Sequence, residues 1–90
     1  MKTDTRRALG PILREARLER GMTQRGVGEA MRMVGHAWSQ QVVGTVERGE
    51  RRLTIDEAVD LTSIDLLDLD EIIEPLPAAE ILRLREVAAR

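Results

Sequence analysis

Apolar residues recur at intervals of three and four along almost the whole chain, and this spacing is the strongest constraint on its fold. Most runs begin beside a residue suited to cap a helix or end at a glycine suited to stop one. No segment shows the alternation of apolar and polar residues that is typical of a half-buried strand. In a chain of 90 residues, this pattern predicts one all-α domain.

Three helices are predicted in the first half of the chain, at residues 6–20, 24–34 and 40–48. Pro11 lies in the first turn of the first helix, where its missing N–H does no harm. Thr23 and Ser39 cap the second and third helices, because their hydroxyls can accept an otherwise unpaired backbone N–H. Gly35 is expected to end the second helix in a left-handed conformation.

Three more helices are predicted in the second half, at residues 54–64, 69–73 and 78–90. Thr54 and Glu57 have the spacing of a capping box at the start of the fourth helix. Asp68 is the expected cap of the short fifth helix. Pro75 and Pro77 interrupt helicity before the last one.

Several individual side chains have a predicted place. Trp38 is expected to pack on Val43 as a core anchor, rather than to contact DNA. His36 is predicted to be an exposed loop residue, with a phosphate contact as the alternative. Three methionines are predicted to fill the core: Met22, Met31 and Met33.

Composition excludes several functions. The chain has no Cys and one His, which rules out disulfides, thiolate metal sites and multi-histidine metal sites. A single Trp is the only aromatic residue, which argues against a stacking platform for single-stranded nucleic acid. No carboxylate has a plausible nucleophile or metal-binding histidine beside it, so neither an enzyme nor a cofactor is expected.

Neither a membrane span nor an export signal is expected from this sequence. It contains no run of 18 apolar residues, so no membrane span is predicted. The first residues, MKTDTRR, have no apolar stretch behind them, so no secretory signal is expected. The expected location is therefore the cytoplasm, at the nucleoid.

The net charge of −2 hides a strong asymmetry. Residues 1–52 carry 11 basic and 6 acidic residues, a net charge of +5. Residues 53–90 carry 3 basic and 10 acidic residues, a net charge of −7. The first half is suited to meet phosphates, and the acidic half to meet a protein partner; ordinary solvated charge is the alternative.

The second and third predicted helices, joined by a short connection containing Gly35, have the arrangement of a helix-turn-helix. Gln40 and Gln41 lie in the first turn of the third helix, where a recognition helix meets base edges. A glutamine amide can pair with adenine, and Gly44 on the same face would let the backbone approach DNA closely. Solvent-facing polar residues are the alternative interpretation.

Three stretches carry a resemblance to a known family: residues 9–17 (LGPILREAR), 21–24 (GMTQ) and 39–49 (SQQVVGTVERG). Over residues 9 to about 73 the chain resembles the lambda repressor-like domain of the Cro/repressor (XRE) transcription factors. The resemblance implies a five-helix DNA-binding domain with a helix-turn-helix, followed here by one extra C-terminal helix. It also implies a double-stranded DNA operator as the partner.

The resemblance assigns roles to particular residues. Base-reading positions fall on Gln40, Gln41, Gly44 and Thr45. Contacts with the DNA backbone are predicted for Gln24, Arg25, Ser39, Arg48, Arg51 and Arg52. A partly buried ion pair beneath the third helix falls on Arg17 and Glu47; two unrelated surface charges are the alternative.

The chain departs from the family pattern between Thr23 and Gly49, where it is about five residues longer. The apolar stripe in this region suggests that the second helix is extended by roughly one turn. Gly26 and Gly28 in this helix have two equal interpretations. Either they allow a close approach of neighbouring backbone, or they are tolerated in a helix held by packing.

The predicted function is a sequence-specific transcriptional regulator, a repressor that binds its operator as a homodimer. An antitoxin-type interaction module that also binds its own operator is the alternative. Residues 1–74 form the predicted DNA-binding domain, and residues 75–90 a C-terminal dimerisation helix, which would otherwise fold back on its own domain. The predicted dimer contacts are Ile81, Leu82, Leu84, Val87 and Ala88.

Overall fold

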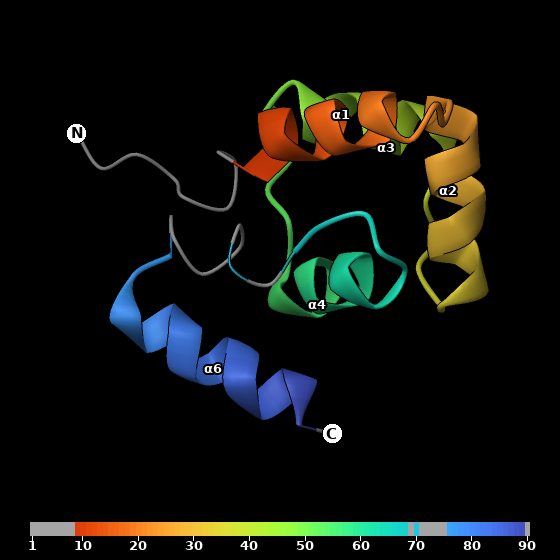
Figure 1. The fold of residues 1–90 in the computed structure, drawn as a ribbon. Helices are drawn as coiled ribbons and strands as arrows, with labels where there is room; N and C mark the ends of the chain where they lie inside the picture. The colour runs from red at the N-terminus through yellow and green to blue at the C-terminus, as the bar shows by residue number, and fades with distance from the viewer. Residues whose placement is uncertain (1–8, 69, 71–75, 90) are drawn as a thin grey trace.

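The computed structural model describes residues 9–68, 70 and 76–89. Within these ranges the chain forms the helices α1 (Leu9–Glu19), α2 (Gln24–Met33), α3 (Gln40–Glu47), α4 (Ile55–Ser63) and α6 (Ala78–Ala88), as Figure 1 shows. The described part contains no strand, and the all-α prediction is confirmed. The short helix predicted at residues 69–73 falls almost wholly outside the described residues, as do the first residues of the predicted first helix.

The helix ends follow local chemistry. The hydroxyls of Thr23, Ser39 and Thr54 each accept the backbone N–H three residues further on, at the starts of α2, α3 and α4. Helix α2 ends at Met33, one residue earlier than predicted, and Gly35 follows with a φ of +97°. The extension of α2 and the left-handed glycine after it are therefore both confirmed.

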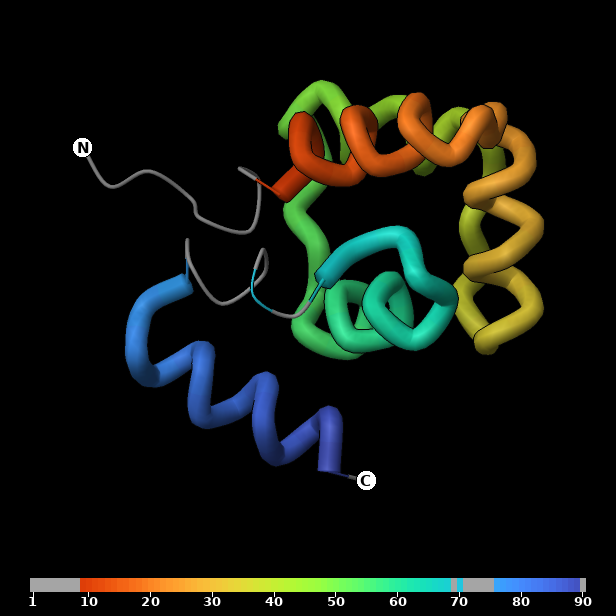
Figure 2. Tube along the Cα trace, viewed as in Figure 1, coloured from red at the N-terminus to blue at the C-terminus, as the bar shows by residue number. Residues whose placement is uncertain are grey.

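The helices form two groups. Helix α3 packs on α1 and α2, which together make the helix-turn-helix half. Helix α4 packs on α6, which lies on the side of α4 away from α2 (Figure 2). The segment between α3 and α4 joins the two groups.

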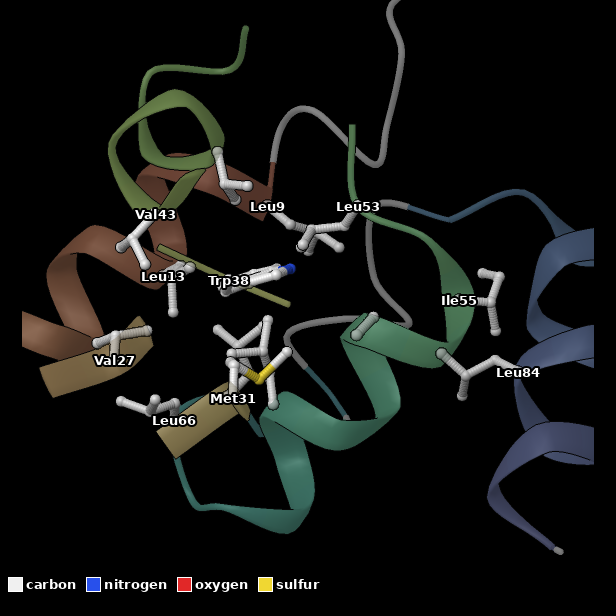
Figure 3. Packing of buried hydrophobic residues seen from close by; sticks show 14 of the residues in the cluster. Leu9, Leu13, Val27, Met31, Trp38, Val43, Leu53, Ile55, Leu66 and Leu84 are labelled. Carbon is white, nitrogen blue, oxygen red and sulfur yellow. The ribbon is translucent and has the colours of Figure 1, made fainter. Parts of the chain in front are cut away.

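One hydrophobic core is shared by all of these helices. Trp38 is buried within it, among the side chains labelled in Figure 3, so its predicted place in the core is confirmed; that it packs on Val43 stays a prediction. Met22 is partly buried at the edge of this core. Met33 is 88% exposed, so its assignment to the core is wrong. Met33 lies two positions after buried Met31, which places it on the opposite side of α2.

Helix α6 folds back on its own domain. Leu84 is fully buried and is directed towards Ile55 of α4, as Figure 3 shows. Ile81 and Val87 are half-buried against the same core. The prediction that Leu84 forms a dimer contact is therefore wrong, because the apolar stripe of α6 completes the core of its own chain.

Two glycines allow helices to approach closely. A Cβ placed on Gly10 of α1 would lie 2.0 Å from the carbonyl oxygen of Val46 in α3. A Cβ on Gly28 of α2 would lie 3.3 Å from the backbone of Ser39, so Gly28 supports the close-approach interpretation. At Gly26 the nearest atom is the capping hydroxyl of Thr23, at 3.3 Å. Nothing in the sequence pattern singled out Gly10.

Candidate nucleic-acid interface

The outer face of α3 presents two amide side chains. Gln40 and Gln41 are exposed in its first turn, next to the cap Ser39. Thr45, one turn further along, is half-buried, and its hydroxyl donates a hydrogen bond to the carbonyl of Val42 at 2.7 Å. The exposed amides are free to turn towards a groove, whereas the Thr45 hydroxyl is already engaged within the helix.

Gly44 does not expose bare backbone on this face. It is buried, and a Cβ there would lie 3.0 Å from the guanidinium of Arg48 and 3.7 Å from the amide of Gln24. The expected direct approach of the Gly44 backbone to DNA is therefore corrected: two polar side chains cover it. Arg48 itself is exposed and pairs with Glu50 at 3.0 Å.

A buried ion pair supports α3 from below. The Nε and Nη2 atoms of Arg17 donate to the two carboxylate oxygens of Glu47 at 2.7 and 3.0 Å. The Arg17 Nη1 atom also donates to the carbonyl of Met22 at 3.0 Å, and the amide of Gln24 donates to Glu47 at 3.1 Å. The structure thus brings Arg17 and Glu47 together and joins α1, α2 and α3 through one carboxylate.

Hydrogen bonding to Glu47 also keeps Arg17 charged. This bond is the largest influence on the pKa of Arg17 and raises it, while burial opposes the charge to a smaller extent. A buried guanidinium with a bidentate partner is satisfied only while Glu47 remains beside it. The pair is therefore a structural support for α3, and its atoms are not available to DNA.

Two of the predicted backbone contacts are basic side chains that reach solvent. Arg25, near the start of α2, has a side chain that is 78% exposed and lies 3.3 Å from Glu29 on the same helix. Arg52 lies about half-exposed in the loop after α3, 4.0 Å from Glu80. Exposed pairs of this kind are weak, so a phosphate can compete for either arginine.

The guanidinium of Arg51 pairs with the carboxylate of Glu57 in α4. Its Nη1 and Nη2 atoms donate to the two oxygens of Glu57 at 3.1 and 2.9 Å, and its guanidinium lies 5.7 Å from the centre of the Trp38 ring. The contact of Arg51 with the DNA backbone stays a prediction, because its side chain is 38% exposed although it is already paired with Glu57. Its guanidinium is directed towards Glu57 because that carboxylate is buried at the start of α4.

Sequence reasoning identified only part of the hydrogen-bond network around Glu57. The capping box with Thr54 was visible in the sequence and is present. The indole Nε1 of Trp38 also donates to Glu57, at 2.7 Å, and this bond and the one from Arg51 had no local signal. Trp38 lies 19 positions from Glu57 in the sequence, and Arg51 lies 6 positions from it. Both side chains reach the carboxylate only because the chain folds back.

Glu57 makes folding sensitive to acid. Burial is the largest influence on its pKa and would raise it, but the bonds from Arg51, the Thr54 N–H and Trp38 together hold the pKa below the ordinary value of a glutamate. The stabilisation is present above the pKa of the unfolded chain and is lost as the pH falls through the lower pKa of the folded state. Urea unfolding at pH 6 and at about pH 3.5 should show a loss of stability that is smaller in Glu57→Gln. An equal loss in both proteins would contradict this.

His36 is not the exposed loop residue that was predicted. Its Nε2 atom lies 2.5 Å from a carboxylate oxygen of Asp60 in α4, and its side chain is largely buried. The turn after α2 places the imidazole over α4, and the alternative of a phosphate contact loses support for the same reason. The connection between α2 and α3 is thereby joined to the second half of the domain.

The described residues contain no cluster of His, Cys, Asp or Glu side chains arranged to hold a metal ion. Among the described helices, none combines the length and apolar character needed to cross a bilayer.

Comparison with known proteins agrees with the geometry. No curated protein and no solved structure matches the chain. A helix-turn-helix family model of the Cro/C1 type matches residues 13–72, which is two thirds of the chain and includes all of α2, α3 and α4. The chain therefore belongs to the Cro/C1-type (XRE) helix-turn-helix family of DNA-binding transcription regulators.

Proposed function

We propose that this regulator is a sequence-specific repressor that binds its operator as a dimer and reads the major groove with residues 39–48. The observation that carries the proposal is the pair Gln40 and Gln41. Both are exposed in the first turn of α3, while the opposite side of this helix is anchored in the core by Val43 and Val46. A polar first turn on a firmly held helix suits recognition of base edges.

Affinity for the phosphates comes from other residues. Arg25, Arg48 and Arg52 are exposed near the helix-turn-helix, where they form ion pairs with Glu29, Glu50 and Glu80, respectively. When such a side chain meets a phosphate, it releases condensed counterions and makes binding depend on salt. The repressor then acts by occlusion: it covers its operator and blocks polymerase, and no catalytic step is needed.

Base reading and backbone binding are separable by substitution. Gln40→Ala or Gln41→Ala should weaken binding to the preferred duplex by about 1–3 kcal/mol for each base that is no longer read, with binding to unrelated DNA nearly unchanged. Arg25→Ala should weaken binding to every duplex and flatten the salt dependence. Selection from a random duplex library, followed by titrations at several salt concentrations, measures both effects.

The same titrations distinguish a loss of base reading from a general loss of DNA affinity. The Arg25→Ala protein is the control for a general loss of DNA affinity, because it removes charge without touching α3. If both glutamine variants keep the preference of the parent protein for its selected duplex, α3 is not the reading helix. If no duplex is enriched at all, the proposal of sequence specificity fails.

The dimer contact is proposed on the outer face of α6. Leu82 is 62% exposed there, and the neighbouring Arg83 and Glu86 are exposed charges that can pair across a two-fold axis. Ala88 is exposed as well, whereas Ile81 and Val87 are half-buried in their own chain. A single recognition helix covers few base pairs, so a second copy on an adjacent half-site is needed for tight binding.

Leu82→Glu should therefore weaken self-association without unfolding the domain. A charged side chain on this face removes the apolar surface and repels its copy, and Leu82 contributes little to the core of its own chain. Sedimentation of the intact chain at tens of micromolar measures the effect, with Met33→Glu as a control at another exposed apolar residue. A parent protein that remains monomeric, or a Leu82→Glu protein that dimerises equally well, would refute this interface.

A further inference from the structure

One carboxylate joins the segments on both sides of the recognition helix. The Oε2 atom of Glu57 accepts hydrogen bonds from the Trp38 indole at 2.7 Å and from Arg51 Nη2 at 2.9 Å. Its Oε1 atom accepts from the backbone N–H of Thr54 at 2.8 Å and from Arg51 Nη1 at 3.1 Å. Trp38 precedes the cap of α3, and Arg51 follows its end. Both flanks of α3 are therefore tied to the first turn of α4.

The hydrogen bonds to Glu57 constrain the segments that precede and follow α3, whereas helix packing constrains α3 itself. Helix α3 packs on α1 and α2, and the carboxylate of Glu47 holds it there from within the helix itself. The hydrophobic effect is itself non-directional, and the contacts of α3 with α1 and α2 do not involve the segments that precede and follow it. The Glu57 bonds have fixed directions and reach both ends of α3, so they define how the helix is turned relative to α4 and α6.

We propose that Glu57 is a positioning residue for DNA recognition, which sets the orientation of α3 and so determines how well Gln40 and Gln41 meet the bases. The inference rests on the proposed function, because it assumes that α3 reads sequence. Glu57 does not touch DNA in this proposal. It acts through Trp38 and Arg51, which it holds in the core and in the loop that follows α3.

The substitution Glu57→Gln separates this role from the capping box. Glutamine serves at this position of a capping box as glutamate does, so its amide oxygen can keep the bond to the Thr54 N–H. The amide nitrogen then faces the Trp38 indole and Arg51 Nη2, and all three groups are donors. The variant therefore keeps the start of α4, loses the bond from Trp38, and keeps only the Nη1 bond of the two from Arg51.

The experiment compares Glu57→Gln with Glu15→Gln, which makes the same charge change at an exposed residue of α1. The duplex selected by the parent protein and an unrelated duplex are both titrated. We expect the preference of Glu57→Gln for the selected duplex to fall by about tenfold, as it would if one base were no longer read, with little change on unrelated DNA. The fluorescence of Trp38 and the backbone amide shifts of α3 should change in Glu57→Gln alone.

Two further variants keep the test decisive if Glu57→Gln does not fold. Trp38→Phe removes only the indole donor, and Arg51→Lys keeps the charge but removes the bidentate bond. Loss of preference in these folded variants supports the positioning role. Retained preference in all folded variants overturns it while leaving the proposed function intact. A parent protein that selects no duplex overturns the proposed function first, and this inference with it.

Discussion

Replacing Gly10 with alanine is expected to destabilise the domain by about 3 kcal/mol, near the upper end of the usual range for overpacking. In most helices this change stabilises, because alanine has the higher helix propensity. Here the new Cβ would lie 2.0 Å from the carbonyl oxygen of Val46, which is backbone and cannot turn aside. Helices α1 and α3 must move apart, and the core between them opens.

Gly44→Ala is the matched control, because it places the same methyl group in another buried glycine of a helix. The atom it meets is the end of the flexible Arg48 side chain, which can move away at little cost. Urea unfolding followed by Trp38 fluorescence measures both variants. Gly44→Ala should be neutral or slightly stabilising, and a Gly10→Ala protein of equal stability would show that α1 and α3 have room between them.

The second large effect is expected at the ion pair beneath α3. Glu47→Ala should lower the free energy of unfolding by about 3–5 kcal/mol, because the buried guanidinium of Arg17 is left without its carboxylate. Arg17→Ala should have an effect of the same order. Denaturant unfolding of each variant gives the difference directly.

Two comparisons identify the cause of that loss. Arg25→Ala removes one partner of an exposed pair and should change stability by no more than about 1 kcal/mol. The double variant Arg17→Met with Glu47→Leu removes both charges and replaces them with apolar volume, so it should recover much of the stability that Glu47→Ala removes. If Glu47→Ala proves no worse than Arg25→Ala, the pair contributes no more than a surface ion pair.

The parts of this fold that could be predicted are those set by neighbours in the sequence. Thr23, Ser39 and Thr54 begin helices because each hydroxyl meets an N–H only three residues away. Gly35 ends α2 through its own backbone freedom. Such features need no knowledge of the tertiary structure, and the extended α2 was predictable for the same reason.

The features that were missed join residues far apart in the chain. His36 meets Asp60, and Gly10 meets Val46, through folding that no local pattern encodes. Periodicity correctly identified an apolar stripe on α6 but could not say whether Leu84 would cover its own core or a second copy. Packing on its own core and packing on a second copy bury the same apolar surface. The free energy gained from burial therefore does not distinguish the two arrangements.

The close approach of Gly10 to Val46 also bears on how this regulator can change its DNA preference over evolutionary time. At the point where α3 crosses α1, no other residue has room, so a new binding preference cannot arise by reshaping this crossing. Variation is instead open at Gln40 and Gln41, whose exposed side chains contribute nothing to the core. Under the proposed function, the tight crossing and the exposed first turn of α3 are separate, so substitutions at Gln40 and Gln41 can alter the preferred DNA sequence without altering the fold.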